Sequence, residues 1–234
     1  MARNRPIPHL SDEDKAFVRS LIIHEDEAVL AFNKPSGLPS QVRGNKARNL
    51  DHLLWAFAKS NGKRPRLVHR LDTGTSGVII AGKTKPAATA LATAFEKRNV
   101  KKTYLAVVSG ALPASERGII DAPIARIETD RGANMVAGHP DGKPSITRWN
   151  VLWRAGNFVL LELLPETGRT HQIRVHLAHI GCPILGDHIY GDKASAPRLM
   201  LHALRLQMPH PNSDVLSIET PAPESFKVES YETR

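Results

Sequence analysis

Residues 69–77, HRLDTGTSG, lead directly into the apolar run at residues 78–81, VIIA. The apolar run predicts a short strand, and the glycine, serine and threonine residues before it favour a turn. One carboxylate, Asp72, lies among these turn formers. Loops held by a rigid strand are common positions for catalytic groups. Local chemistry leaves two interpretations open, because Asp72 is either a catalytic carboxylate or a turn aspartate that accepts backbone N–H bonds.

Outward from this stretch, apolar periodicity predicts both strands and helices. The expected strands are residues 28–33, 78–81, 104–108, 146–153 and 158–163, and the expected helices are residues 50–60, 86–98 and 170–180. Residues 11–14, SDED, predict the start of a further helix with acidic residues in its first turn. The polar, glycine-containing residues 126–143 predict a long hairpin or a mobile basic loop, and the last fifteen residues predict a surface strand or tail.

A second segment, residues 166–177, ETGRTHQIRVHL, carries cationic and imidazole groups at the expected start of a helix. Thr170 is the expected N-cap, and Gly181 is expected to end the helix. The expected apolar stripe consists of Ile173, Leu177 and Ile180. His171 and Arg174 are three residues apart and share another face, from which Arg174 could hold a carboxylate such as Asp72. A purely structural ion pair of Arg174 is the alternative, and the two interpretations are compatible.

Length and charge limit the class of protein. The 234 residues fit one large domain or two merged subdomains, with residues 1–20 as a short extension before a domain at 21–234. The formal charge of +9 suits a polyanionic partner such as nucleic acid, although a merely basic enzyme is the alternative. The single cysteine, Cys182, excludes an intrachain disulfide, and we expect it to be a small buried hydrophobe. No export signal or membrane span is evident, so we expect a cytoplasmic protein.

Two other chemistries fit the sequence poorly. The histidines suggest a metal site, but there is no HExxH pattern, no cysteine pair and no nearby acidic ligand at metal spacing. Ser76 lies in Thr75-Ser76-Gly77, which is not the nucleophile elbow of serine hydrolases. We therefore expect neither a metal nor a serine nucleophile.

Several segments, in order, resemble the RluA family of RNA pseudouridine synthases. Residues 69–77 resemble the signature that carries the catalytic aspartate of the family. The other matching segments are residues 34–37 (KPSG), 102–108 (KTYLAVV), 168–176 (GRTHQIRVH), 181–191 (GCPILGDHIYG) and 201–203 (LHA). The resemblance spans about residues 28–210. It implies an α+β fold with a central mixed, mostly antiparallel sheet, flanking helices and a catalytic cleft across the middle of the sheet.

The resemblance also implies roles for individual residues. Asp72 would be the catalytic carboxylate, Arg174 would pair with it, and Tyr104 would stack on the target uracil. A half-buried strand aromatic is the alternative for Tyr104, as a plain core position is for Leu201. The implied substrate-binding residues are Arg70, His69, Leu201, Lys34, Arg169 and His171.

The implied reaction breaks the N1–C1′ bond of a uridine and rejoins the uracil through C5, which requires no cofactor. Ionised Asp72 could add to C1′ or remove the 2′ hydrogen, and both routes stay open. The expected partner is structured RNA, either ribosomal or transfer RNA, bound by a monomer without a preceding S4 domain. A non-catalytic RNA-binding protein and a glycoside hydrolase or base-excision glycosylase are the rival classes, although hydrolases usually use two carboxylates.

Overall fold

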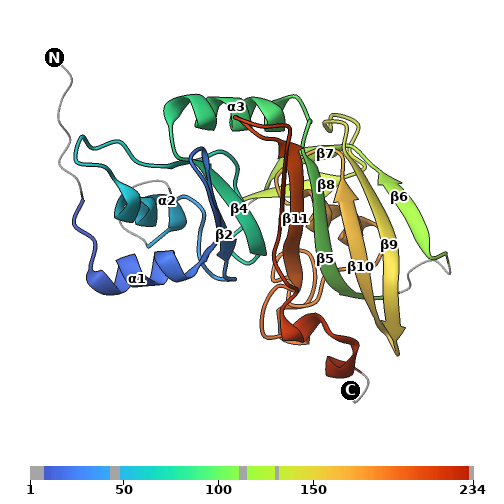
Figure 1. Ribbon diagram of the computed structural model, residues 1–234. Helices are drawn as coiled ribbons and strands as arrows, with labels where there is room; N and C mark the ends of the chain where they lie inside the picture. The colour runs from blue at the N-terminus through green and yellow to red at the C-terminus, as the bar shows by residue number, and fades with distance from the viewer. Residues whose placement is uncertain (1–7, 43–47, 111–114, 130–131, 232–234) are drawn as a thin grey trace. The chain divides into compact units, whose positions relative to one another are not determined.

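The computed structural model describes residues 8–42, 48–110, 115–129 and 132–231 (Figure 1). The chain divides into two compact units. Unit 1 consists of Met1–Val100 and Arg205–Thr220, and unit 2 consists of Lys101–Leu204 and Pro221–Arg234. Strand β11 (Leu201–Pro209) crosses this division and supplies residues to both units.

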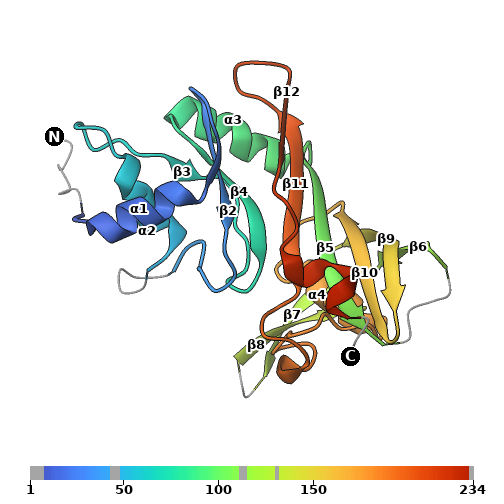
Figure 2. The same ribbon diagram turned by 60° about the horizontal axis from the view of Figure 1, so that its bottom comes forward.

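Unit 1 is built on antiparallel strands in the order β1-β2-β4, with β3 beside β4 and β12 beside β11 (Figure 2). Its strands are β1 (Ile22–Glu25), β2 (Val29–Lys34), β3 (Arg66–Leu67), β4 (Ser76–Gly82) and β12 (Val215–Glu219). Its helices are α1 (Asp12–Ser20), α2 (Leu50–Leu53), the 3-10 turn η1 (Leu54–Phe57) and α3 (Lys85–Glu96). Because β2 and β4 are antiparallel neighbours, the residues that follow β2 lie close to the residues that precede β4.

The core of unit 1 forms where α3 packs on the sheet. Every residue of β4 is buried, and α3 contributes Ala87, Leu91 and Ala94 to the same cluster. The end of β4 approaches α3 closely, since a Cβ at Gly82 would lie 2.4 Å from the backbone nitrogen of Ala88. Only glycine fits such an approach.

Unit 2 contains a second antiparallel array in the order β5-β10-β9-β6, in which β5, β10 and β9 lie side by side (Figure 1). Its strands are β5 (Lys101–Ser109), β6 (Arg117–Asp121), β9 (Ile146–Ala155) and β10 (Phe158–Pro165). A separate hairpin pairs β7 (Ile124–Thr129) with β8 (Gly132–Ala137). Helix α4 (Gln172–His179) and the 3-10 turns η2 (Lys193–Ser195), η3 (Glu224–Phe226) and η4 (Val228–Ser230) complete the unit. The α+β class with a mostly antiparallel sheet is therefore confirmed.

Most predicted elements are confirmed within a few residues. Ser11 caps α1 by accepting a hydrogen bond from the Asp14 N–H, and the segment at 126–143 contains the β7–β8 hairpin. The turn of this hairpin, residues 130–131, lies outside the described residues. Residues 1–7 of the expected N-terminal extension also lie outside them, and Val18 of α1 is buried. The proposed boundary at residue 20 stays a prediction.

Three predictions of local structure are wrong. The helix expected at residues 50–60 ends earlier, because α2 tightens into the 3-10 turn η1 and Ala58 is extended. The N-cap of α4 is His171 and not Thr170, since His171 adopts the left-handed conformation with φ of 55°. The C-terminal segment is not a plain surface tail, because Phe226 and Tyr231 are buried in the core of unit 2. Long-range packing explains the third difference, because both aromatic side chains join the core of unit 2.

Candidate active site

The loop that carries Asp72 is fixed on both sides of the carboxylate. Leu71 is buried, and Ser40 holds its backbone twice, since the Ser40 hydroxyl donates to the Leu71 carbonyl at 2.7 Å and accepts from the Leu71 N–H at 3.0 Å. After Asp72, the Thr75 N–H donates to the Asp72 carbonyl at 3.1 Å. The Asp72 side chain itself is half-buried. The sequence therefore folds locally into a turn that presents one carboxylate at a fixed point.

Residues 34–37 contact the same loop through hydrogen bonds to its backbone. Lys34 is fully buried, and its ammonium donates to the carbonyl oxygens of Pro35, Leu38 and Thr73 at 3.0, 2.8 and 3.2 Å. The Gly37 N–H also donates to the Thr73 carbonyl at 2.8 Å, from a backbone with φ of 89°. Lys34, expected to bind substrate, thus points inward at backbone carbonyls, and this geometry favours a positioning role.

His69 and Arg70 precede the Asp72 loop and differ in environment. The Nε2 atom of His69 accepts a hydrogen bond from the Ile80 N–H at 3.0 Å, and the ring stacks on Phe95 with centroids 4.5 Å apart. Because a backbone N–H can only donate, Nε2 carries no proton and the proton of the neutral ring lies on Nδ1. Arg70 is exposed. The position of Arg70 suits an RNA contact, whereas His69 ties the loop to β4.

Tyr104 and Leu201 lie in unit 2. Tyr104 is a half-buried residue of β5, paired in register with Leu163 of β10. Leu201 is 4% exposed and belongs to the hydrophobic core of the unit. Leu201 therefore fits the core alternative, while its contact with substrate and the stacking of Tyr104 on uracil stay predictions.

Arg174 is a buried residue of α4 that forms a side-on pair with Asp187. Its Nε and Nη2 atoms donate to the two carboxylate oxygens of Asp187 at 2.8 and 2.7 Å, and its guanidinium lies over the ring of Tyr190. Asp187 also accepts from the N–H groups of Ile189 and Tyr190. Burial raises the pKa of Asp187, but the hydrogen bonds and charge of Arg174 and these N–H groups lower it below its usual value overall.

The structural ion pair that the sequence left open for Arg174 is thus present with Asp187. Its pairing with Asp72 stays a prediction. Asp187 was not expected at the site, although it lies in the motif at residues 181–191.

The loop before α4 is organised by Gln172. Its Oε1 atom accepts from the Thr167 hydroxyl at 2.7 Å and from the Arg169 N–H at 3.0 Å. Its Nε2 atom donates to the Thr147 hydroxyl at 3.1 Å. The His171 ring is hydrogen-bonded through Nδ1 to the Tyr190 hydroxyl at 2.8 Å. These contacts order the loop before α4. The left-handed backbone of His171 is a local feature that the helical pattern did not indicate.

A buried polar chain continues from Gln172 through Thr147 to His176. His176 is fully buried, with Nδ1 2.9 Å from the Thr147 hydroxyl and Nε2 3.0 Å from the Ala122 carbonyl. Burial lowers the pKa of His176 most strongly, and the Ala122 carbonyl raises it only in part. A carbonyl can only accept, so Nε2 carries the proton and Nδ1 accepts from the threonine hydroxyl.

Three further findings concern metal binding, the cysteine and membrane-spanning helices. No group of three or more histidine, cysteine, aspartate or glutamate residues is arranged to hold a metal ion in the described residues. Cys182 is buried, and burial raises the pKa of its thiol, as expected for a small hydrophobic residue. In the described part of the chain, no helix is both long and apolar enough to cross a membrane.

The family model described as RNA pseudouridylate synthase matches residues 28–179. A ribosomal large subunit pseudouridine synthase D from Haemophilus ducreyi is 38% identical over 224 residues, covering 88% of this chain and 68% of the relative. An uncharacterized RNA pseudouridine synthase from Zymomonas mobilis is 33% identical, covering 88% of this chain and 94% of the relative. The solved structure of human RNA pseudouridylate synthase domain containing 4 has a TM-score of 0.74 at 27% identity, covering 93% of this chain and 95% of that one.

The chain belongs to the RNA pseudouridylate synthase family, and the RluA resemblance of its ordered motifs is confirmed. It is an isomerase that converts uridine in RNA to pseudouridine.

Proposed function

We propose that this chain isomerises uridines of large-subunit ribosomal RNA, with Asp72 as its catalytic carboxylate. The similarity to synthases named for the ribosomal large subunit supports this RNA over transfer RNA. The formal charge of +9 favours a polyanionic substrate in either case. We further propose that the protein acts in the cytoplasm as a monomer. Light scattering of the purified protein tests the monomeric state.

The observation that carries the assignment of Asp72 is the way its loop is held. Ser40 fixes the backbone of Leu71 by two hydrogen bonds, and the Lys34 ammonium bonds to the Thr73 carbonyl. An ordinary surface turn aspartate needs no such support from buried polar side chains. Catalytic groups do, because a displacement of about 1 Å can cost about 100-fold in rate.

The reaction requires few protein groups besides this carboxylate. The N1–C1′ bond breaks with its electron pair left on N1, the freed uracil turns, and a C5–C1′ bond forms. The hydrogen on C5 then leaves as a proton and N1 takes up a proton, so the product is an isomer of uridine. Asp72 acts either as a nucleophile at C1′ or as a base at the 2′ hydrogen. The target uridine must leave its stack, which costs a few kcal/mol, and stacking on Tyr104 would return about 1–3 kcal/mol of that cost.

The expected contributions of the remaining residues follow from their environments. Arg174, oriented by Asp187, would pair with the Asp72 carboxylate and hold it in place. Arg70, Arg169 and His171 would contact the RNA, and Lys34 and His69 would position the Asp72 loop.

The test is Asp72→Asn, assayed on unmodified large-subunit ribosomal RNA carrying tritium at C5 of uridine. Isomerisation releases the tritium to water, so we expect the variant to release none while it still binds the RNA. The control is Asp214→Asn, which removes the same charge from an exposed position between β11 and β12. Release by the Asp72 variant at the rate of the control protein would overturn the assignment.

The same assay separates the rival reaction and the rival RNA. A glycosidase would release free uracil and leave an abasic site, whereas isomerisation leaves the mass of the RNA unchanged. A transfer RNA transcript assayed in parallel decides between the two RNA classes. Tritium release only from transfer RNA would refute the ribosomal assignment and keep that of Asp72.

A further inference from the structure

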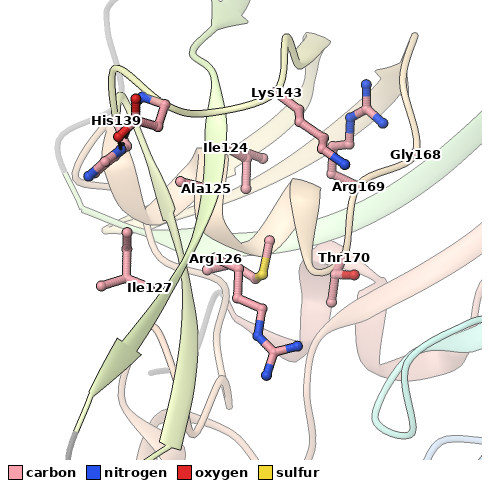
Figure 3. Close-up of a pocket in the computed structure, with 11 residues that line it drawn as sticks. Ile124, Ala125, Arg126, Ile127, His139, Lys143, Gly168, Arg169 and Thr170 are labelled. Atoms are coloured by element: carbon pink, nitrogen blue, oxygen red, sulfur yellow. Dashed lines mark hydrogen bonds and ion pairs between the residues drawn. The ribbon is translucent and has the colours of Figure 1, made fainter.

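Unit 2 contains a pocket of about 480 Å³ at the base of the β7–β8 hairpin (Figure 3). Its walls come from β7, β8, the turn that follows β8 and the loop at residues 168–170. A volume of this size is within the range of sites that hold a small molecule or a nucleotide.

Backbone contacts hold the walls of this pocket in place. Ile124 and Lys143 exchange two backbone hydrogen bonds, at 3.0 and 2.9 Å, and Arg126 is paired in register with Met135 across the hairpin. On the opposite wall the Arg169 N–H is bonded to Gln172. The pocket is therefore largely preformed.

Cationic side chains dominate the polar lining. Arg126, Lys143 and Arg169 surround the pocket, as Figure 3 shows, while Asp141 is the acidic residue among those that line it. Arg126 is ion-paired with Glu128 at 3.0 Å, but both side chains are largely exposed, so water weakens the pair. The local charge thus favours an anion.

Arg169 supplies the most specific feature. Its Nε atom is buried, and no hydrogen-bond acceptor reaches it in the part of the chain that the structure describes. A buried donor without an acceptor is unfavourable, and most such groups in proteins are satisfied. A phosphate oxygen would satisfy this donor, because guanidinium groups bind phosphate by charge-assisted hydrogen bonds.

The rest of the lining is mostly apolar, with His139 and Thr170 as its further polar side chains. Ile124, Ile127 and Met135 offer hydrocarbon and a thioether sulfur but no polar side-chain atom to pair with a base edge. Methionine packs well against aromatic rings. A flat heterocycle joined to a phosphate would fit both the apolar part and the cationic part of this lining. Single-stranded RNA presents this combination at every unpaired nucleotide.

We propose that this pocket binds one unpaired nucleotide of the RNA substrate, with its phosphate on Arg169 and Lys143 and its base against Met135. The proposal rests on the proposed RNA function. It adds to the binding of the target uridine a second site at which the enzyme binds an unpaired nucleotide. The base would be held by stacking and shape, so the site would be tolerant of sequence.

The experiment measures binding separately from catalysis, using the full chain with Asp72→Asn and a uridylate decamer as the probe. Arg169→Gln and Lys143→Gln are each added to this background. We expect each to weaken binding by about tenfold and to lower the slope of log affinity against log salt by about 0.7, the value for one lost phosphate contact on a single strand.

The matched control is Arg117→Gln, which removes one positive charge from an exposed position on β6 outside the pocket. We expect its effect on affinity to be less than about twofold. An equal loss of affinity in the control and in both pocket variants would overturn the proposal, because the pocket would then act only through net charge. Thermal unfolding checks that each variant is folded, and Lys143 is exposed, so its replacement is tolerated.

A second readout reports on the base. In protein labelled with ¹³C at the methionine methyl groups, the decamer is expected to shift the Met135 signal. Met200 and Met208 are buried at 1% and 3% exposure and serve as internal references. A Met135 signal that does not move when the RNA is saturating would overturn the proposal. Neither readout depends on tritium release, so failure of the proposed function and failure of the pocket are distinguishable.

Discussion

The guanidinium of Arg174 and the carboxylate of Asp187 form a buried side-on ion pair, with Nε–Oδ2 at 2.8 Å and Nη2–Oδ1 at 2.7 Å. The two side chains are 4% and 0% exposed. Arg174 was expected from its motif, but its partner in this pair was not. The geometry fixes the plane of the guanidinium, which a lysine at position 174 could not reproduce.

Replacing Asp187 by asparagine should destabilise the protein by about 3–5 kcal/mol, because it leaves a buried guanidinium without its counter-charge. Asparagine keeps an acceptor for the Ile189 and Tyr190 N–H groups, so the effect reports mainly on charge. Urea denaturation measures it. The control is Glu219→Gln, whose exposed pair with Arg205 should be worth less than about 1 kcal/mol. Similar losses in both variants would contradict this account.

Replacing Ser40 by alanine should both destabilise the fold and slow catalysis. The change leaves the buried backbone N–H and carbonyl of Leu71 without their shared partner, at a cost of about 1–3 kcal/mol. The adjacent Asp72 would shift, and we expect kcat for tritium release to fall by about 10- to 100-fold. Ser217→Ala on β12, where the serine is exposed, is the matched control. An unchanged kcat in Ser40→Ala would show that the loop keeps its position without this contact.

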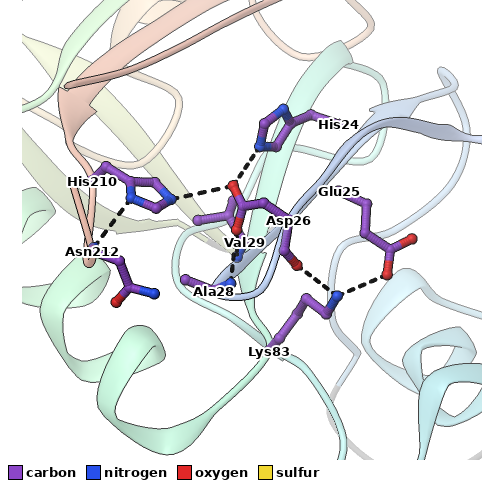
Figure 4. Close-up of polar contacts among 8 residues, drawn as sticks. All are labelled: His24, Glu25, Asp26, Ala28, Val29, Lys83, His210 and Asn212. Atoms are coloured by element: carbon purple, nitrogen blue, oxygen red, sulfur yellow. Dashed lines mark hydrogen bonds and ion pairs between the residues drawn. The ribbon is translucent and has the colours of Figure 1, made fainter. Parts of the chain in front are cut away.

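Asp26 is the centre of a polar cluster in unit 1 (Figure 4). Its Oδ2 atom lies 2.6 Å from Nε2 of His24 and 3.2 Å from Nε2 of His210, while Oδ1 accepts from the N–H groups of Ala28 and Val29. Partial burial raises the pKa of Asp26, but these hydrogen bonds together hold it far below its usual range. The cluster joins the turn after β1 to the chain just past β11.

Stability should therefore fall as the pH falls below about 4, the pKa of an unfolded aspartate. Below that pH the unfolded chain binds a proton that the folded Asp26 does not, so the free energy of unfolding decreases until the folded pKa is passed. Asp26→Asn should show a shallower acid slope in urea denaturation series than either the unmodified protein or Asp214→Asn. A slope unchanged by Asp26→Asn would place the acid sensitivity elsewhere.

His176 should contribute a second pH dependence at higher pH. Its folded pKa is lowered by burial, so the unfolded chain binds the extra proton first as the pH falls below about 6.5. Stability is then lost progressively towards the folded pKa. We expect His176→Gln to have a shallower slope of unfolding free energy between about pH 7.5 and 5.5. Nitrogen-15 NMR should find the proton on Nε2 in the unmodified protein, and a charged ring at neutral pH would contradict the expected tautomer.

The sequence by itself determined the features that depend on neighbouring residues. The Ser11 cap, the strand after Asp72 and the presence of helix α4 follow from side-chain periodicity and turn chemistry. The expected apolar stripe of α4 is wrong, because residues 172–177 are all buried, polar ones included. The end of α4 at Gly181 is equally local, since φ there is 76°. The ordered motifs added the family and the expectation that Asp72 is catalytic.

The tertiary structure alone decided which distant groups meet. It turned Lys34 inward to carbonyls, gave Arg174 the partner Asp187, and joined Gln172 to Thr147. It also placed His171 in a left-handed backbone conformation that helical periodicity does not predict. The physical reason is that a buried polar group must find a partner wherever the packed chain brings one, and the spacing of residues along the sequence does not encode that position.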